Sequence, residues 1–326
     1  MRIDNWHFAG RWILSAALML TLGAAAGCSA DREPGELFGP ETEVGTLVID
    51  ALLIVDRPLP AIYIRQTLAP GERYTSANAG VAGASVTIRQ GDRAYPYASD
   101  PRKLGRYLPP AGAPAVLPET LYELTVASGD RTATSATTTP DRIQISQSVI
   151  LDESTLEIRK ELKTFLDGED VIYTDPANQV NYLDGLLEAR FNPVDVKAYQ
   201  VGIQSLDLDS ERVLDVDWLD EEDYEDLERQ ESSPPFEAKD GKLRLPWFAI
   251  YFGGRHLIRI YALDTNWFDF VRSSPDEMDG GGFGGLAGEN FERPIFHVEG
   301  GIGLFGSASV DSIGFFVLPK KGDVGS

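Results

Sequence analysis

Side chains that could act as nucleophiles, bases or metal ligands are few in this 326-residue sequence, which has one cysteine and three histidines. His256 and His297 lie in the body of the chain. On separate strands they could meet with a carboxylate to hold a metal ion, but their spacing does not indicate this. A Ser-His-Asp hydrolase would need one of them, and no G-x-S-x-G motif occurs. We therefore expect structural histidines, no catalytic residues and no cofactor.

The single cysteine, Cys28, points to covalent attachment. It follows an apolar run over residues 12–22 and the small residues 23–27, the order of a secretory signal with a processing site. Small residues before a cysteine resemble a bacterial lipobox, although Ala25 stands where that pattern usually has Leu. The pattern predicts lipidation at Cys28 after removal of residues 1–27. A plain secreted protein and an uncleaved anchor are the alternatives, and the apolar run is short of the ~20 residues of a spanning helix.

An acylated Cys28 would hold the protein at a membrane, since more than one acyl chain makes attachment stable. Ser29 follows the cysteine, and by resemblance to the sorting rules of Gram-negative bacteria this favours the outer membrane. Residues 28–43 are polar and punctuated by Gly and Pro, which indicates a tether. Twelve such residues span roughly 20 Å if flexible. We expect an outer-membrane location, with the membrane face left open.

Acidic residues dominate one segment, residues 206–231, with thirteen Asp or Glu and two Arg. Such a charge density favours a solvated surface insertion. Asp207, Asp209 and Glu211 have the alternate spacing of a loop that wraps a cation, but the Gly and Glu of an EF-hand are missing. They are weak calcium candidates, and a calcium-stabilised adhesin-like module is one functional alternative.

Aromatic residues cluster late in the chain, and four of them are candidates for ligand or partner contact. Alternate side chains of a strand face opposite sides, so about half of such a cluster could be exposed. Exposed aromatic rings on a β scaffold stack on sugars or dock a partner, whereas buried rings belong to the core. The four candidates are Trp247, Tyr251, Trp267 and Phe268.

The composition limits the partners. The formal net charge is −22 at pH 7, which disfavours nucleic acid and anionic membrane surfaces. The Gly-rich residues 278–288 lack the GK[ST] ending and strand–helix context of a phosphate loop, so we expect a surface loop. No nucleotide cofactor is therefore expected.

The elements that must position these residues are short strands. Residues 44–140 show six or seven of them with regular turn signals, including two hairpins, which favours an immunoglobulin-like or transthyretin-like sandwich. Pro140 ends this predicted domain. The expected strands cover residues 46–55, 61–67, 84–89, 93–97, 105–107, 121–127 and 131–138.

Residues 141–326 predict a second β-rich domain with insertions, which makes the expected fold class all-β. Asp264 is the expected N-cap of a short helix over residues 264–271, and a second helix is expected over 218–227. Large apolar residues interrupt the glycines of residues 300–306, which predicts a tight turn or bulge with positive φ. Strands are expected over residues 143–150, 183–191, 198–206, 247–253, 256–263 and 309–318.

The whole pattern resembles one family. Residues 291–307, FERPIFHVEGGIGLFGS, resemble the C-terminal signature of the uncharacterised lipoproteins known as domain of unknown function 4249. Residues 62–67, 81–88, 122–126 and 138–140 resemble its N-terminal strands in order. The resemblance implies an outer-membrane lipoprotein, of a kind often encoded beside TonB-dependent transporters, and it carries over no catalytic residues.

The sequence therefore leaves three candidate functions. The first is a non-enzymatic accessory or binding lipoprotein, with a TonB-dependent transporter as a partner that the resemblance implies. The second is a hydrolase of the cell envelope that uses carboxylates or a His/carboxylate metal site. The third is the calcium-stabilised module.

Overall fold

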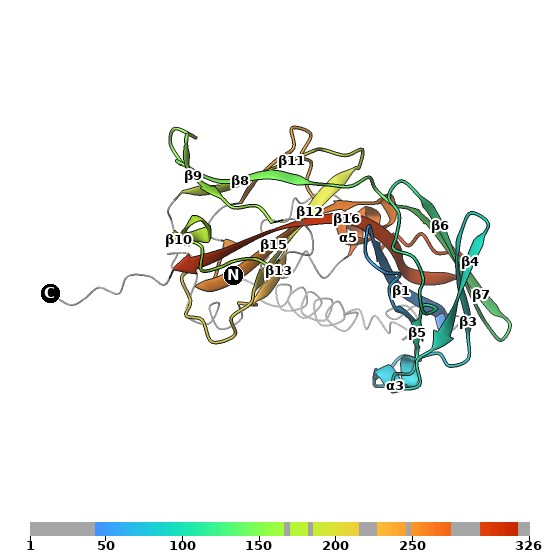
Figure 1. Ribbon diagram of the computed structural model, residues 1–326. Helices are drawn as coiled ribbons and strands as arrows, with labels where there is room; N and C mark the ends of the chain where they lie inside the picture. The colour runs from blue at the N-terminus through green and yellow to red at the C-terminus, as the bar shows by residue number, and fades with distance from the viewer. Residues whose placement is uncertain are drawn as a thin grey trace, which may run out of the picture. The chain divides into compact units, whose positions relative to one another are not determined.

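The computed structural model describes residues 43–165, 170–181, 185–214, 227–245, 249–274 and 294–318 (Figure 1). The chain divides into two compact units. The first comprises Met1–Val44 and Ala69–Glu72, of which residues 43, 44 and 69–72 are described. The second comprises Gly45–Leu68 and Arg73–Ser326 and holds every element named below. Its elements are mostly strands, which confirms the predicted all-β class.

The strands expected over residues 44–140 are present, and both hairpins are confirmed, because β3 pairs with β4 and β6 with β7 in antiparallel register. Buried and exposed residues alternate along β6, as expected when successive side chains point to opposite faces. One short helix, α3, was not predicted. The elements are β1 (Leu47–Ile54), β2 (Ile62–Gln66), α3 (Ser76–Ala79), β3 (Ser85–Gln90), β4 (Arg93–Ser99), β5 (Arg106–Leu108), β6 (Leu121–Ser128) and β7 (Arg131–Thr138).

The second half of the chain contains longer strands and the helix α5. Asp264 is its N-cap, as predicted. No helix in the described ranges has the length and apolar character to cross a membrane. The elements are β8 (Ile145–Leu151), β9 (Ile158–Leu162), η2 (Pro176–Asn178), β10 (Gln179–Asn181), β11 (Leu186–Phe191), β12 (Ala198–Ser205), β13 (Gln230–Ser232), β14 (Lys242–Leu245), β15 (Gly254–Leu263), α5 (Thr265–Ser273) and β16 (Gly301–Leu318).

One expected strand is absent. Of residues 247–253, the described part forms only an isolated bridge between Phe252 and Arg212. The carbonyl of Tyr251 accepts hydrogen bonds from the amides of both Val213 and Leu214, at 2.9 and 3.1 Å, which is not the pattern of a ladder. The helix expected over 218–227 falls almost wholly outside the described residues, as do Cys28, Trp247 and the Gly-rich residues 278–288.

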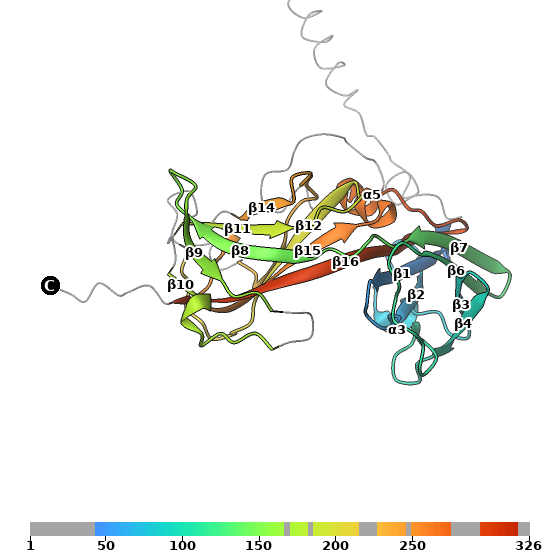
Figure 2. The ribbon, with the colours of Figure 1, turned by 45° about the horizontal axis from the view of Figure 1, so that its top comes forward.

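The long strand β16 connects the two halves of the chain (Figure 2). Its first part runs parallel to β1, with Leu47 opposite Gly301 and Ile54 opposite Ala308. Its second part runs antiparallel to β15. The large sheet therefore has the order β13-β12-β15-β16-β1-β2-β5-β4-β3-β6-β7, with β10 also paired to β16. A separate sheet has the order β14-β11-β8-β9.

The last strand in the order of the large sheet, β7, lies beside the start of β16. Thr134 on β7 and Glu299, just before β16, donate backbone hydrogen bonds to each other at 2.9 and 2.8 Å. The strands from β16 to β7 thus enclose one hydrophobic core, built from residues between 47 and 133 together with Phe305. A second core, built from residues between 143 and 317, includes side chains from both sheets. The domain boundary near residue 140 and the immunoglobulin-like topology stay predictions.

The tight turn or bulge predicted for residues 300–306 is found only at Gly300, which lies in a turn; residues 301–306 form the start of β16, in unshifted register with β1. Gly300 and Gly303 do have positive φ, +72° and +105°, as expected. At Gly303 the reason is close approach rather than chain reversal, since a Cβ there would lie 2.1 Å from the carbonyl oxygen of Ile49 on β1. Glycine lets two parallel backbones come together where a side chain would separate them.

Replacing Gly303 by Ala should therefore be costly. The added Cβ meets backbone and the φ is unfavourable, so we expect a loss of roughly 3 kcal/mol in the free energy of unfolding. Gly91→Ala is the control: its φ is +56°, but nothing lies within 4 Å of the added Cβ. It should cost only about 1 kcal/mol. Denaturant unfolding of both variants measures the difference, and equal losses would contradict the close-approach explanation.

Candidate functional site

The residues most able to form a site gather around α5. The segment that follows β15 reads DTNWFDFVRS, with a capping Asp and apolar residues at helical spacing, so a short helix forms there. The Asp264 carboxylate accepts a hydrogen bond from the amide of Trp267 at 2.9 Å, as an N-cap does. Three clefts open beside this helix, and their linings include Asp264, Phe268 and Asn266 respectively.

The start of α5 joins β7 to β16. The Nδ2 amide of Asn266 donates to the carbonyl of Ala136 on β7 at 2.7 Å and to that of Phe305 on β16 at 2.8 Å. Asn266 is 8% exposed; its bond to Phe305 is buried and its bond to Ala136 is partly buried. A single side chain thus satisfies carbonyl groups from both strands. We call this junction of β7, β16 and the start of α5 the seam.

Asp264 completes the seam. The Thr137 hydroxyl donates to its Oδ2 at 2.5 Å, and the same hydroxyl lies 2.7 Å from the Ser307 hydroxyl on β16. Burial raises the pKa of Asp264, while the hydrogen bonds from Thr137 and Trp267 oppose that shift. Because its oxygens are engaged by neighbouring groups, this carboxylate is a structural acceptor.

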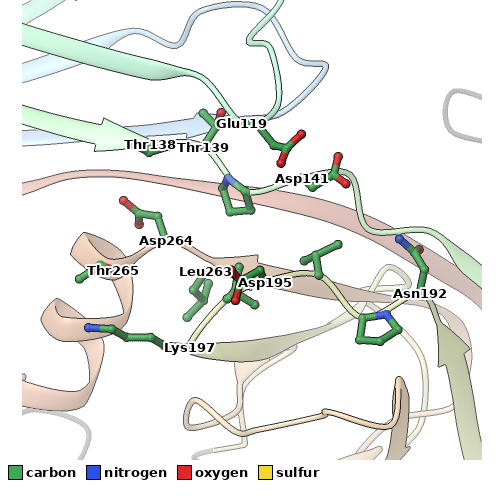
Figure 3. Close-up of a pocket in the computed structure, with 14 residues that line it drawn as sticks. Glu119, Thr138, Thr139, Asp141, Asn192, Asp195, Lys197, Leu263, Asp264 and Thr265 are labelled. Carbon is green, nitrogen blue, oxygen red and sulfur yellow. The ribbon is translucent and has the colours of Figure 1, made fainter.

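The first cleft, which we call the acidic cleft, has a volume of about 760 Å³ (Figure 3). Its walls come from residues 138–141, 192–197 and 263–265, together with Glu119. Figure 3 shows the carboxylates of Glu119 and Asp141 on one side and the ammonium of Lys197 on the α5 side. Asp195 and Asp264 line it as well, so the cleft is polar and acidic, with Lys197 as the cationic side chain in its lining.

The second cleft, which we call the apolar cleft, has a volume of about 400 Å³ and shares residues 193–197 with the first, apart from Asp195. Apolar side chains form most of it, and Lys197, Glu237 and Lys239 also line it. The Lys197 ammonium lies 5.8 Å from the centre of the Phe268 ring, and the Arg272 guanidinium lies 5.3 Å from it. Both distances suit cation–π attraction. The apolar lining residues are Pro193, Val194, Val196, Tyr199, Ala238 and Phe268.

The third cleft, of about 690 Å³, includes His297 and is called the His297 cleft. The Nε2 atom of His297 lies 2.8 Å from the Asp269 carboxylate on α5, which also accepts from Arg272 at 2.8 Å. Burial raises the pKa of Asp269, but the bonds from Arg272 and His297 outweigh it and hold that pKa below its usual value. The nearby Ser135 hydroxyl donates to the backbone carbonyl of His297 and not to its ring. Asp269 thus pairs with both His297 and Arg272, and the Ser135 hydroxyl does not bond the His297 ring as the serine of a catalytic triad would.

The other histidine stands apart. His256 is 1% exposed, stacks on Phe315 with ring centres 5.7 Å apart, and its Nδ1 lies 3.0 Å from the Gly254 carbonyl. Burial lowers the pKa of His256 to about 4, so its ring is neutral at pH 7. Within the described ranges, no three His, Cys, Asp or Glu residues are arranged to hold a metal ion.

The calcium candidates do not form a ring of ligands in this structure. The Asp207 carboxylate accepts from the amide and the guanidinium of Arg255, each at 2.7 Å. The bond from the Arg255 side chain holds the pKa of Asp207 below its usual value. Asp209 and Glu211 are exposed. Asp207 is thus already neutralised by a cation of the protein itself.

The aromatic candidates separate into two places. Trp267 and Phe268 lie on α5. The Trp267 ring packs against the Tyr261 ring on β15, with the ring centres 5.5 Å apart. Tyr251 precedes β15, whereas α5 follows it, and a ten-residue strand is roughly 30 Å long. The structure therefore brings two of the described candidates together and not the third. Lys197, Asn266 and Asp269 were not predicted, because a single Lys, Asn or Asp carries no signal in a local pattern.

Removing the Asn266 side chain should open the seam. In Asn266→Ala, two carbonyls lose a buried donor, and we expect a loss of about 2–3 kcal/mol in the free energy of unfolding. Asn192→Ala is the matched control, because Asn192 also bonds two backbone groups, Gln144 and Arg142, but is exposed. Its loss should stay below about 1 kcal/mol. Denaturant unfolding compares the two variants. A loss of unfolding free energy for Asn266→Ala as small as that for Asn192→Ala would contradict the role of Asn266 in joining β7 to β16.

Asp264 should give stability a distinctive pH dependence. A raised pKa means that the folded state binds this proton more tightly than the unfolded state does. The contribution of Asp264 to stability therefore falls as pH rises from its ordinary pKa, near 4, to its raised pKa in the fold. We expect the stability of wild type minus that of Asp264→Asn to fall over this window. Unfolding curves at stepped pH test it, and a difference that rises with pH would show the assignment to be wrong.

A comparison with protein families identifies the chain. Residues 33–313 match the family described as Domain of unknown function (DUF4249), and the chain belongs to this family. The resemblance seen in the sequence is thus confirmed. A comparison with curated proteins found no match.

Proposed function

We propose that this member of the DUF4249 family is a lipid-anchored, non-enzymatic binding protein of the bacterial outer membrane. The position of Cys28 after an apolar run and five small residues supports the anchor. Ser29, which follows the cysteine, supports the outer membrane over retention at the inner membrane. Acylation would place the body at the bilayer surface, tethered by residues 28–43.

The observation that carries the binding role is the convergence of three clefts on α5. Two of the groups there that could do acid–base chemistry, Asp264 and His297, are engaged by protein partners. Asp264 is bonded by Thr137 and Trp267, and His297 pairs with Asp269. A cleft with a partly exposed ring and fixed charges can recognise a ligand without transforming it.

We further propose that the partner is a TonB-dependent transporter. A lipid anchor confines both proteins to one membrane, so that a weak contact is strengthened by high effective concentration. The accessory would present the surface around α5 to the partner or to a shared ligand. The net charge of the whole sequence, −22, favours a ligand or partner surface that is not strongly anionic.

The anchor is tested by Cys28→Ala in native cells. Wild type should incorporate labelled palmitate and sediment with the outer membrane, whereas the variant should incorporate none and leave that fraction. Chemical crosslinking from the same membranes should recover a transporter barrel with wild type only.

Two outcomes would overturn these claims separately. If Cys28→Ala fractionates like wild type and the label is absent from both, the lipoprotein assignment is wrong. If wild type is labelled and lies in the outer membrane but crosslinks to no transporter, the anchor stands and the transporter partnership is wrong.

A further inference from the structure

The apolar cleft has a preformed floor. Tyr199 forms part of it, and its hydroxyl is engaged by the backbone of Val194, accepting from the amide at 2.8 Å and donating to the carbonyl at 3.2 Å. The centre of its ring lies 5.1 Å from that of the Phe191 ring and 6.3 Å from that of the Phe236 ring. The ring is therefore fixed by its neighbours. An apolar group that enters the cleft would meet Tyr199 and Phe268 without rearranging the core.

The charges at this cleft are not equally available. Lys239 pairs with Glu237 at 2.7 Å, and Arg272 pairs with Asp269 at 2.8 Å. Lys197 is different, because the described part of the chain places no carboxylate within 4 Å of its ammonium. It acts on Asp269 only at longer range. In a protein of net charge −22, the cleft thus offers an apolar floor and a cation left for a ligand.

We propose that the apolar cleft binds a small carboxylate with an apolar body, the carboxylate at Lys197 and the body over Phe268 and Tyr199. The proposal rests on the binding role proposed above and names its ligand class. An ammonium group with three donors is well suited to one carboxylate, and the apolar body gains from leaving water.

The neighbouring acids favour a monoanion over a more highly charged ligand. Asp195 belongs to the same segment as Lys197 but lines the acidic cleft, as does Asp264. A second negative charge on the ligand would be repelled by these carboxylates, whereas a single charge is matched by Lys197. A cationic ligand would instead face Lys197 itself. This charge balance distinguishes a carboxylate from a phosphate monoester.

The test is calorimetry on the full chain in lipid nanodiscs, with empty nanodiscs as baseline. The probes are 4-phenylbutyrate, its neutral amide and 4-phenylbutyl phosphate, and N-acetyl-leucyl-phenylalanine represents a peptide carboxyl terminus. The carboxylates should bind, and the amide and the phosphate should bind at least about tenfold more weakly. Whichever carboxylate binds more tightly identifies the source, a free acid or a chain terminus.

Matched variants then locate the binding. Lys197→Met should weaken binding of the carboxylate by about tenfold or more, and Lys197→Arg should retain it. Phe268→Ala should weaken the carboxylate and the amide alike. Lys163→Met is the control, because Lys163 also lies 5.8 Å from a phenylalanine ring, that of Phe165, and is absent from the lining of the apolar cleft. It should change the Kd less than twofold.

Equal binding of the acid and the amide, or equal effects of the Lys163 and Lys197 substitutions, would overturn the proposal. If no carboxylate binds while palmitate labelling and transporter crosslinking are intact, the ligand class is wrong and the proposed function stands. If labelling and crosslinking fail while Lys197-dependent carboxylate binding is seen, the ligand class stands and the anchored accessory role is wrong.

Discussion

The fold depends on one polar junction, the seam where the start of α5 ties β7 to β16. A sheet that bends back on itself leaves two strands facing each other with backbone groups to satisfy. Here Asn266 satisfies a carbonyl on each strand, and Asp264 accepts from Thr137 beside Ser307. In a buried setting these bonds act together, because a broken one leaves an unpaired polar group without water.

The seam has a consequence for how the chain must fold. Strand β1 pairs with β16, from the other end of the sequence, and Thr137 bonds Asp264 across 127 residues. The core enclosed by β1 to β7 includes Phe305 of β16, so the N-terminal strands are completed by C-terminal residues. Pairings this distant in sequence form slowly, since the entropy of closing the intervening loop must be met first. Helix α5 also links the seam to the clefts, because it contributes residues to both.

Local sequence patterns predicted most of the strands and the cap of α5. They did not predict the contacts among β7, β16 and α5 that close the large sheet. Alternation and turn residues revealed the hairpins between residues 84 and 138, and the Asp before an apolar run revealed the cap of α5. Residues 300–306 were interpreted as a tight turn or bulge, because glycine permits these as well as a close backbone approach, and only the partner strand distinguishes them. The polar face of β7, with Ser135 and Thr137, had no visible reason in its own segment, because its partners His297 and Asp264 come from far along the chain.

Hydrogen–deuterium exchange on Asn266→Ala and wild type tests whether α5 closes the sheet at the seam. We expect faster exchange in β7 and the first part of β16 of the variant, with protection unchanged in β8 and β11 of the four-stranded sheet. Protection that is unchanged at the seam, or lost equally in both sheets, would contradict this role of α5.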